Sequence, residues 1–332
     1  MSRYFVTGAT GFIGGHLARR LRAEGHSVTT TARTPAKAQD LVAAGIEVHP
    51  GDLTQRESLR VPMLGADGVF HVAAWYSVGS HERGMARAIN VDGTRNVLET
   101  MRDLGIAKGV YTSTVGVFGD TGGRLLAEDP AQPGKLLTEY DRTKWAAHYE
   151  VAKPMQQAGL PLVIVQPGIV YGPGDTSTVR TSLREYLTGR LAATPQVTAY
   201  CWAYIDDIVE GHVLAMHNGR VGESYIIAGP RHSLIEAFEI AERITGIAAP
   251  RQHPAPGVMC ALSAIMSVLE RIVPVPEAYS GEGLRVIAGT TYLGDNAKAR
   301  RELGYAPRSL EDGLRLTLQN EMRELGMTLP AR

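Results

Sequence analysis

Apolar residues in the first half of the chain alternate between short runs and longer amphipathic stretches. The short runs predict strands at residues 4–8, 27–32, 46–50, 69–74, 108–114 and 160–167. Between them, apolar residues recur three and four positions apart, which predicts helices over 12–24, 35–44, 82–104 and 139–158. Strands that alternate with helices are typical of a parallel sheet covered on both faces. We therefore predict an α/β protein with a doubly wound parallel sheet.

The pattern becomes less regular after Pro167. The segment 198–229 holds a turn, a helix and a further strand at Ser224–Gly229, which we expect to return to the sheet. Helices and loops dominate from Pro230 onward. The interpretation is a dinucleotide-binding domain over 1–170, joined by 198–229. A smaller, mostly helical substrate domain is expected from 171–197 and 230–332.

Composition and charge exclude several classes of protein. The 332 residues include 34 Lys and Arg and 34 Asp and Glu, so the net charge is +0 and a general nucleic-acid binder is not expected. The two cysteines, Cys201 and Cys260, lack metal-ligand spacing, and the ten histidines form no HExxH pair, so no metal site is expected. Glycines come too early at the N-terminus for a signal peptide, and we expect a cytoplasmic protein.

The most apolar stretch is Gly257–Leu269, GVMCALSAIMSVL. It is shorter than the roughly 20 residues that cross a bilayer. We interpret it as a buried helix, with a helix lying on a membrane or binding lipid as the alternative.

Three glycines lie between the first strand and the first helix, in the sequence GATGFIG. Gly8 permits a tight turn, Gly11 lets backbone amides approach a pyrophosphate, and Gly14 allows close packing of helix on sheet. The N-terminus of the helix adds partial positive charge. At the first strand–helix junction, this pattern favours dinucleotide binding over an ordinary tight turn.

Several motifs together closely resemble those of extended short-chain dehydrogenases/reductases. They are TGATGFIGGHL, GDL, HVAA, NVDGTRNVL, TSTVGVFG, YDRTK, QPGIVYGPGD, WAYIDDIV and NAKARRELGYAP. They extend over nearly the whole chain. The resemblance implies a Rossmann fold, a nicotinamide cofactor and a catalytic Tyr–Lys pair. It also implies cofactor contacts from residues in these motifs, namely Phe12, Ile13, Asp52, Leu53, Ala73, Ala74, Pro167 and Gly168. Asp52, the adenine-contacting residue by resemblance, is alternatively a helix cap.

The end of the second strand bears on the choice of cofactor. An NAD enzyme usually has an acidic residue there that binds the ribose 2′-hydroxyl. Here the residues are Ala32 and Arg33. A guanidinium can bind a 2′-phosphate through charge-assisted hydrogen bonds, although an Arg after a strand can also simply face solvent. We therefore favour NADP(H), with NAD(H) as the alternative.

Tyr140 and Lys144 lie four residues apart on a predicted helix and face the same side. An ammonium group one turn away is expected to lower the pKa of the phenol and make Tyr140 an acid/base. By resemblance, the third catalytic group is Thr114, with Ser113 as the alternative hydroxyl. Asn90 resembles the Asn that orders the helix and a relay water around the lysine, and the alternative is a helix N-cap.

Two reactions use this machinery. The first, favoured by Arg33, is NADPH-dependent reduction of a ketone or aldehyde, as in dihydroflavonol or cinnamoyl-CoA reductases. The second is epimerisation or dehydration of a sugar nucleotide; such enzymes commonly place an Arg near TAYCWAYIDD, where this chain has none. A third alternative is an inactive protein that only senses the cofactor. Such a protein would have lost Tyr140 or Lys144, and both are present.

Trp75, Tyr76 and Tyr171 are candidates for an apolar pocket, or for the core. The partner expected is a small molecule, and the family often forms homodimers.

Overall fold

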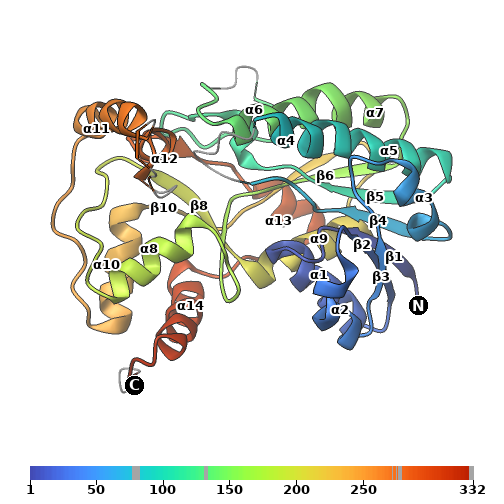
Figure 1. Ribbon diagram of the computed structural model, residues 1–332, viewed down its shortest axis with the longest axis horizontal. Coiled ribbons are helices and arrows are strands. Elements are labelled where there is room, and N and C mark those ends of the chain that lie inside the picture. The colour runs from blue at the N-terminus through green and yellow to red at the C-terminus, as the bar shows by residue number, and fades with distance from the viewer. Residues whose placement is uncertain (77–82, 131–133, 271, 274, 276–278, 329–332) are drawn as a thin grey trace.

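The computed structural model describes residues 1–76, 83–130, 134–270, 272–273, 275 and 279–328 (Figure 1). Its larger part is a seven-stranded parallel sheet in the order β3-β2-β1-β4-β5-β6-β9. The strands are β1 (Arg3–Thr7), β2 (Ser27–Ala32), β3 (Glu47–Pro50), β4 (Gly68–His71), β5 (Lys108–Thr112), β6 (Leu162–Pro167) and β9 (Ser224–Ile227). The strand order reverses between β1 and β4, and such a reversal opens a crevice at the carboxyl ends of the strands. The predicted doubly wound fold is confirmed.

Helices cover both faces of this sheet. On one face, α1 (Phe12–Ala23) and α9 (Ile205–Asn218) pack together and join a core that includes Leu17, Val165 and Ile208. The other face carries α3 (Glu57–Met63), α5 (Gly93–Asp103) and α6 (Glu139–Ala146), over a core that includes Phe5 and Ile164. Because both faces are buried, the strands read as nearly continuous apolar runs.

Both long helices predicted beside the sheet contain a π-helical turn. The first consists of α4 (Arg83–Arg87), the π turn η2 (Ala88–Asp92) and α5, while its predicted first residue, Glu82, lies outside the described residues. The second consists of α6, the π turn η4 (Ala147–Ala152) and α7 (Lys153–Gln157). The two π turns contact each other. Single π turns occur frequently at functional sites, and η2 holds Asn90.

A second, smaller sheet was not predicted. Strand β8 (Ala199–Tyr204) pairs with β7 (Ile169–Tyr171), β10 (Arg231–Ser233) and β11 (Thr291–Tyr292). Within 198–229, β8 therefore lies in the second sheet, whereas α9 and β9 belong to the large one. The other elements are η1 (Pro35–Lys37), α2 (Gln39–Ala43), η3 (Val115–Phe118), α8 (Thr178–Leu187), α10 (Leu234–Thr245), α11 (Pro256–Leu269), α12 (Gly281–Val286), α13 (Ala297–Leu303) and α14 (Leu310–Glu324).

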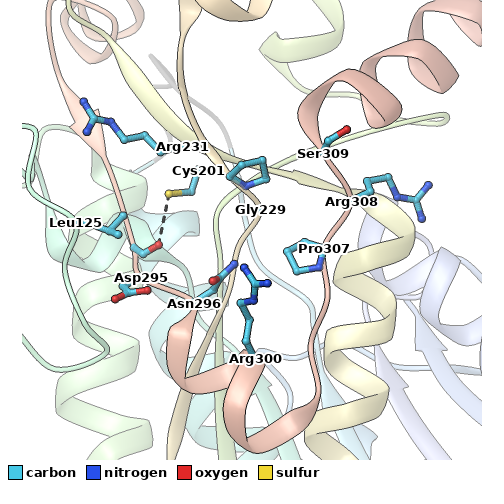
Figure 2. Close-up of a pocket in the computed structure, with 12 residues that line it drawn as sticks. Leu125, Cys201, Gly229, Arg231, Asp295, Asn296, Arg300, Pro307, Arg308 and Ser309 are labelled. Atoms are coloured by element: carbon cyan, nitrogen blue, oxygen red, sulfur yellow. Dashed lines mark hydrogen bonds between the residues drawn. The ribbon is translucent and has the colours of Figure 1, made fainter.

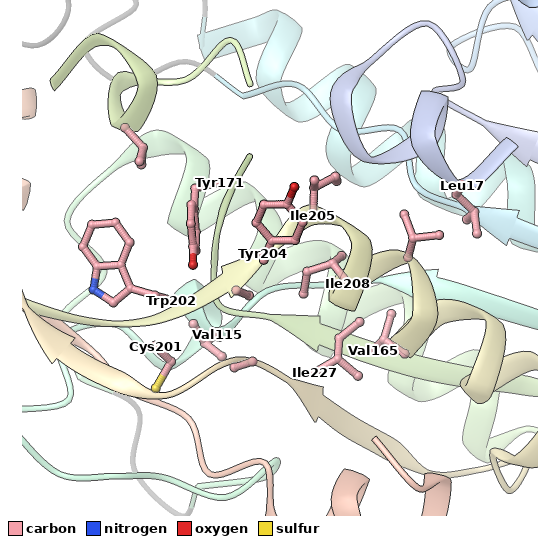
Figure 3. Close-up of a cluster of buried hydrophobic side chains, with 14 of the residues drawn as sticks. Leu17, Val115, Val165, Tyr171, Cys201, Trp202, Tyr204, Ile205, Ile208 and Ile227 are labelled. Carbon is pink, nitrogen blue, oxygen red and sulfur yellow. The ribbon is translucent and has the colours of Figure 1, made fainter. Parts of the chain in front are cut away.

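The two sheets share one continuous core. Figure 3 shows Val165 and Ile227 from the large sheet in the same cluster of buried side chains as Trp202 and Tyr204 of β8. Tyr171, a candidate pocket residue, is 1% exposed and packs edge-on against Trp202 and Tyr204. It therefore belongs to this core and does not line an open pocket.

The apolar segment 257–269 forms α11, and the prediction of a buried helix is wrong. Only Met259 and Ser263 of α11 are buried, whereas Val258, Ile265 and Val268 are 61%, 63% and 60% exposed. The helix lies at one end of the molecule, packed against α12 (Figure 1). Among the described residues, no helix has both the length and the apolar character needed to span a membrane.

Candidate active site

The glycine turn between β1 and α1 has the geometry expected of a phosphate cradle. Gly8 has a φ of 73°, and a Cβ there would lie 2.8 Å from the Ala73 Cα. A Cβ on Gly14 would lie 2.2 Å from the Gly8 carbonyl oxygen. These two positions therefore require glycine, and the close packing leaves the turn free of side chains at the N-terminus of α1. The turn fits a dinucleotide pyrophosphate.

The other residues expected to contact a cofactor lie at the same edge of the sheet. Phe12 and Ile13 begin α1, Leu53 follows β3, and Ala73 and Ala74 follow β4. Parallel strands bring their carboxyl ends to one edge, so segments far apart in sequence meet there. The structure thus gathers these residues around one crevice.

One carboxylate oxygen of Asp52 is hydrogen-bonded within the turn that contains it. Its carboxylate accepts hydrogen bonds from the Thr54 amide (2.9 Å) and the Thr54 hydroxyl (2.8 Å) through one oxygen, Oδ1. These bonds close a turn at Thr54. The alternative of a helix cap is not found, because α3 has Arg56 at its N-cap and no side-chain cap hydrogen bond. A role toward an adenine remains a prediction.

Arg33 is exposed at the end of β2. Among the described residues no carboxylate forms an ion pair with it. Neither preceding residue is acidic. Ala32 is buried, and the side chain of Thr31 packs against Gly51. A free guanidinium thus stands where an NAD enzyme would carry a carboxylate.

The two candidate hydroxyls after β5 point in different directions. Ser113 is 3% exposed, and its hydroxyl lies 2.7 Å from His148 Nδ1 in the core. Thr114 is half-buried, accepts a hydrogen bond from the Gly116 amide (3.0 Å) and lies near enough to Tyr140 to lower its pKa. Successive residues of an extended chain face opposite sides, so only Thr114 faces Tyr140.

Tyr140 sits in the first turn of α6. Thr138 and Asp141 form a reciprocal capping box that fixes the start of this helix. The Tyr140 ring meets Tyr76 edge-on, with 4.9 Å between centroids. The residue as a whole keeps intermediate exposure.

The expected lowering of the Tyr140 pKa is not found. Burial raises the pKa of Tyr140 above its ordinary value, Tyr76 and Asp141 add to the increase, and the side chain of Thr114 opposes it. Tyr140 is therefore a protonated phenol at neutral pH, the form that donates a proton.

Lys144 is buried, with 2% exposure, and its ammonium group is held by the neighbouring strand. Its Nζ donates to the Thr112 carbonyl (2.8 Å) and to the Tyr111 hydroxyl (3.2 Å). Burial lowers the pKa of Lys144 to about 7. Its charge state therefore depends on the hydrogen-bond acceptors around it.

Asn90 locks the loop after β4 onto α6. Its Oδ1 accepts from the Trp75 amide (2.7 Å), and its Nδ2 donates to the Trp75 carbonyl (3.0 Å) and to Thr143 Oγ1 (3.0 Å). It lies inside the π turn η2, so it is not a helix N-cap. Since Thr143 directly precedes Lys144, Asn90 is bonded to the residue next to the lysine in the chain.

Pro167 and Gly168 join the two sheets. Pro167 ends β6, and a Cβ on Gly168 would lie 2.2 Å from the Cys201 carbonyl oxygen of β8. The backbone of the second sheet thus passes directly over the end of the large sheet. A contact of this turn with a nicotinamide remains a prediction.

The sequence analysis missed two tyrosines that pack near Asp141, the residue next to Tyr140. Tyr200 of β8 stacks on Tyr292 of β11, with centroids 6.2 Å apart, and the Tyr292 hydroxyl donates to the Asp141 carboxylate (3.0 Å). The charge of Tyr76 influences the titration of both Tyr140 and Tyr200. The second sheet supplies these side chains, and its short strands gave no signal of their own.

His71 was also missed as a site residue. The HVAA motif drew attention to the alanines, yet His71 at the end of β4 bonds Thr7 on one side and Thr94 on the other. A single histidine in an apolar run gives no indication of such a network.

A separate cavity of about 250 Å³ lies beside β8 and the segments around α13 (Figure 2). Its lining includes Cys201, Arg231, Asn296 and Arg300. None of the predicted site residues lines it. Within the described residues no group of three metal-ligating side chains is assembled.

The fold and this site define a nicotinamide-dependent enzyme with a Tyr–Lys pair. The model of the NAD dependent epimerase/dehydratase family matches residues 4–228. The chain belongs to this family, and the resemblance to extended short-chain dehydrogenases/reductases is confirmed.

Individual relatives match nearly the whole chain. "Sterol demethylase protein B" of Methylococcus capsulatus is 30% identical over 312 residues, covering 92% of this chain and 93% of the relative. A "4-hydroxy-2-methyl-3-oxo-4-farnesyl-3,4-dihydroquinoline-1-oxide ketoreductase" of Stigmatella aurantiaca is 31% identical over 317 residues, covering 92% of each. The crystal structure of gox2253 superposes with a TM-score of 0.84 and 27% identity, covering 99% of this chain and 100% of that one.

Proposed function

We propose that the protein is an NADP(H)-dependent reductase that converts a ketone or aldehyde of a small, largely apolar substrate into an alcohol. The observation that carries the proposal is the position of Thr114, just after β5, near Tyr140 in the first turn of α6. The hydroxyls of both residues can donate to one substrate oxygen. The ketoreductase name of one relative supports this chemistry.

The residues of the chain divide the work of the reaction. Thr114 Oγ1 already accepts from an amide, so its proton is free to hydrogen-bond the carbonyl oxygen of the substrate. Tyr140 gives its proton to that oxygen, and the ammonium group of Lys144 favours the phenolate that is left. A reduced nicotinamide, when bound at the glycine turn, supplies the hydride to the carbonyl carbon.

The surface around Tyr140 favours an apolar substrate. Tyr76 presents its ring to Tyr140, and strand β8 (AYCWAY) carries no charged residue. A diphosphate would require cations at this position. Two relatives carry names that refer to a sterol and to a farnesyl group, which supports the same class of substrate.

A substrate panel tests the reaction. Purified protein is incubated with NADPH and alkyl or aryl ketones and aldehydes of increasing size, and separately with UDP- and dTDP-sugars. We expect NADPH oxidation with apolar carbonyl compounds and no change in the sugar nucleotides. Conversion of a sugar nucleotide, or NAD retained stoichiometrically through purification, would replace the reductase by an epimerase or dehydratase.

The preference for NADP(H) rests on the unpaired Arg33. A hydrogen bond to a charged group contributes about 1.5–3 kcal/mol, so we expect NADPH to bind roughly ten- to a hundredfold more tightly than NADH. Arg33→Ala should remove most of this preference and leave NADH affinity nearly unchanged. Fluorescence titration with both reduced cofactors measures it.

Arg60 provides a matched control for this measurement. It is an exposed arginine on α3. Arg60→Ala should leave both affinities as in the wild type. A wild type that prefers NADH would contradict the assignment of the cofactor, whatever the substrate.

A further inference from the structure

The outward side of α11 is apolar along its whole length. Its sequence, PGVMCALSAIMSVL, contains no charged residue. The exposed aliphatic side chains recur three and four positions apart, so they form one continuous stripe on the helix. This stripe, called here the apolar face of α11, consists of Val258, Leu262, Ile265, Val268 and Leu269, and Ile272 and Val273 extend it beyond the helix. A contiguous apolar surface of this kind marks a site of interaction.

The hydroxyl groups of α11 lie on the opposite side, against α12. The Ser263 hydroxyl donates to the Gly281 carbonyl (2.6 Å), and a Cβ on Gly281 would lie 1.8 Å from Ser267 Oγ. Met259 is the one large apolar side chain of α11 that is buried. A helix on the surface of a protein in water normally buries its apolar stripe and exposes its polar one. Here the arrangement is reversed, and small and polar residues at a helix contact are typical of helices that face lipid.

The charges of the α11–α12 pair favour an anionic partner. The Glu270 carboxylate, directly after α11, accepts from the Gly281 amide (3.0 Å). The Glu282 carboxylate of α12 accepts from the Glu139 amide (3.2 Å). Arg285 of α12 is exposed, and no carboxylate within the described part of the chain forms an ion pair with it. The acids are thus engaged by backbone amides, whereas a cation remains available.

We propose that the apolar face of α11 docks the protein onto the surface of an anionic lipid bilayer. The helix stands at one end of the molecule, where a flat surface can reach it (Figure 1). Its 14 residues are fewer than the roughly 20 that cross a bilayer, so it lies in the plane of the surface with its aliphatic side chains among the acyl chains. Arg285 then meets the headgroup phosphates.

A second copy of the chain is the other apolar body that could cover this face. It would bring the same α11–α12 pair, in which Glu270 and Glu282 are already engaged by amides. That pair would offer Arg285 no free anion, whereas an anionic bilayer offers many. The charges therefore favour the bilayer.

Docking at α11 also bears on the catalytic groups. The hydrogen bond between Glu282 and Glu139 joins α12 to the first residue of α6, and Glu139 directly precedes Tyr140. An apolar substrate partitions from water into the bilayer. Under the proposed function, the bilayer is therefore the source of the substrate, and the helix pair that rests on it contacts the start of the catalytic helix. The docking itself does not depend on the proposed function.

The test is sedimentation of the purified full chain with sucrose-loaded vesicles, without cofactor or substrate. The vesicles consist of equal parts phosphatidylcholine and phosphatidylglycerol, or of phosphatidylcholine alone. We expect the wild type to sediment with the anionic vesicles and more weakly with the neutral ones. Val268→Ser, which removes one aliphatic side chain from the face, should lower the partition coefficient about tenfold, and Ile265→Ser combined with it about a hundredfold.

Val61→Ser is the matched control. Val61 lies on α3 and is 69% exposed, against 60% for Val268, so the two variants remove the same side chain from comparably exposed positions. Val61→Ser should leave the partition coefficient unchanged. Arg285→Ala should lower binding to the anionic vesicles about fivefold, the usual contribution of one basic residue near a charged surface, and leave binding to the neutral vesicles unchanged.

A wild type that stays in solution beside anionic vesicles would overturn the proposal, as would equal partition coefficients for Val268→Ser and Val61→Ser. A dimer that forms without vesicles and dissociates in Val268→Ser would also overturn it, since a second copy would then cover the face; analytical ultracentrifugation measures this. The sedimentation needs no substrate. Vesicle binding by a protein that reduces no carbonyl compound would therefore refute the proposed function and keep this inference, and a reductase that binds no vesicles would do the reverse.

Discussion

The carboxyl edge of the large sheet buries polar side chains, whereas the outer face of α11 exposes apolar ones. At the crevice, buried polar groups such as Asn90, Lys144 and His71 each have several hydrogen-bond partners. On α11, the aliphatic side chains Val258 and Ile265 remain largely in solvent. The candidate catalytic groups thus lie where the fold fixes these polar side chains, while α11 keeps an apolar surface in solvent.

The sharpest way to test the role of the crevice is Tyr140→Phe. This change removes one oxygen and keeps the ring that packs against Tyr76. Turnover should fall roughly 10²- to 10⁴-fold, the usual contribution of a positioned acid, with NADPH affinity nearly unchanged. Steady-state kinetics and cofactor titration measure both effects. Turnover within a fewfold of wild type would remove Tyr140 from the mechanism.

A smaller effect separates the two neighbouring hydroxyls at this edge. Thr114→Val removes the group that faces Tyr140 and should lower kcat on the order of 10²-fold, as for loss of one hydrogen bond to a developing oxyanion. Ser113→Ala removes the group that faces His148 and should leave kcat near wild type. A slow Ser113→Ala enzyme beside an unimpaired Thr114→Val enzyme would reverse the assignment.

The smallest effects compare one residue type in the two regions. Ile164 of β6 is 0% exposed, and Ile164→Ala should lower the free energy of unfolding by about 2–5 kcal/mol. Ile265 of α11 is 63% exposed, and Ile265→Ala should change it by less than about 0.5 kcal/mol. Urea denaturation of both variants measures the difference. Equal losses would mean that α11 is covered in solution.

The crevice was more predictable from sequence than the region around it. The glycine turn and the Tyr–Lys pair depend on local spacing, so GATGFIG and YDRTK were sufficient to locate them. The assignment of Thr114 over Ser113 needed the direction of each side chain, which the packing of His148 decides. The pKa of Tyr140 depends on burial by neighbours distant in sequence, and its direction was predicted wrongly.

The second sheet and α11 were beyond sequence-based prediction for different reasons. Strands β7, β10 and β11 have three, three and two residues, too few for an alternating pattern to stand out. For α11, an uninterrupted apolar run indicates a helix that avoids water but not which neighbour would cover it. Here the covering neighbour, α12, reaches only one side.

The strand order of the large sheet also has a consequence for biosynthesis. Strand β6 lies between β5 and β9, but β9 is made only after residues 168–223 have been synthesised. Until then β6, LVIVQP, is an unprotected edge with apolar residues on both faces. Such edges promote pairing between chains. We expect truncated or slowly translated chains that end before Ser224 to aggregate, and chaperones that bind extended apolar segments to recognise β6 during this interval.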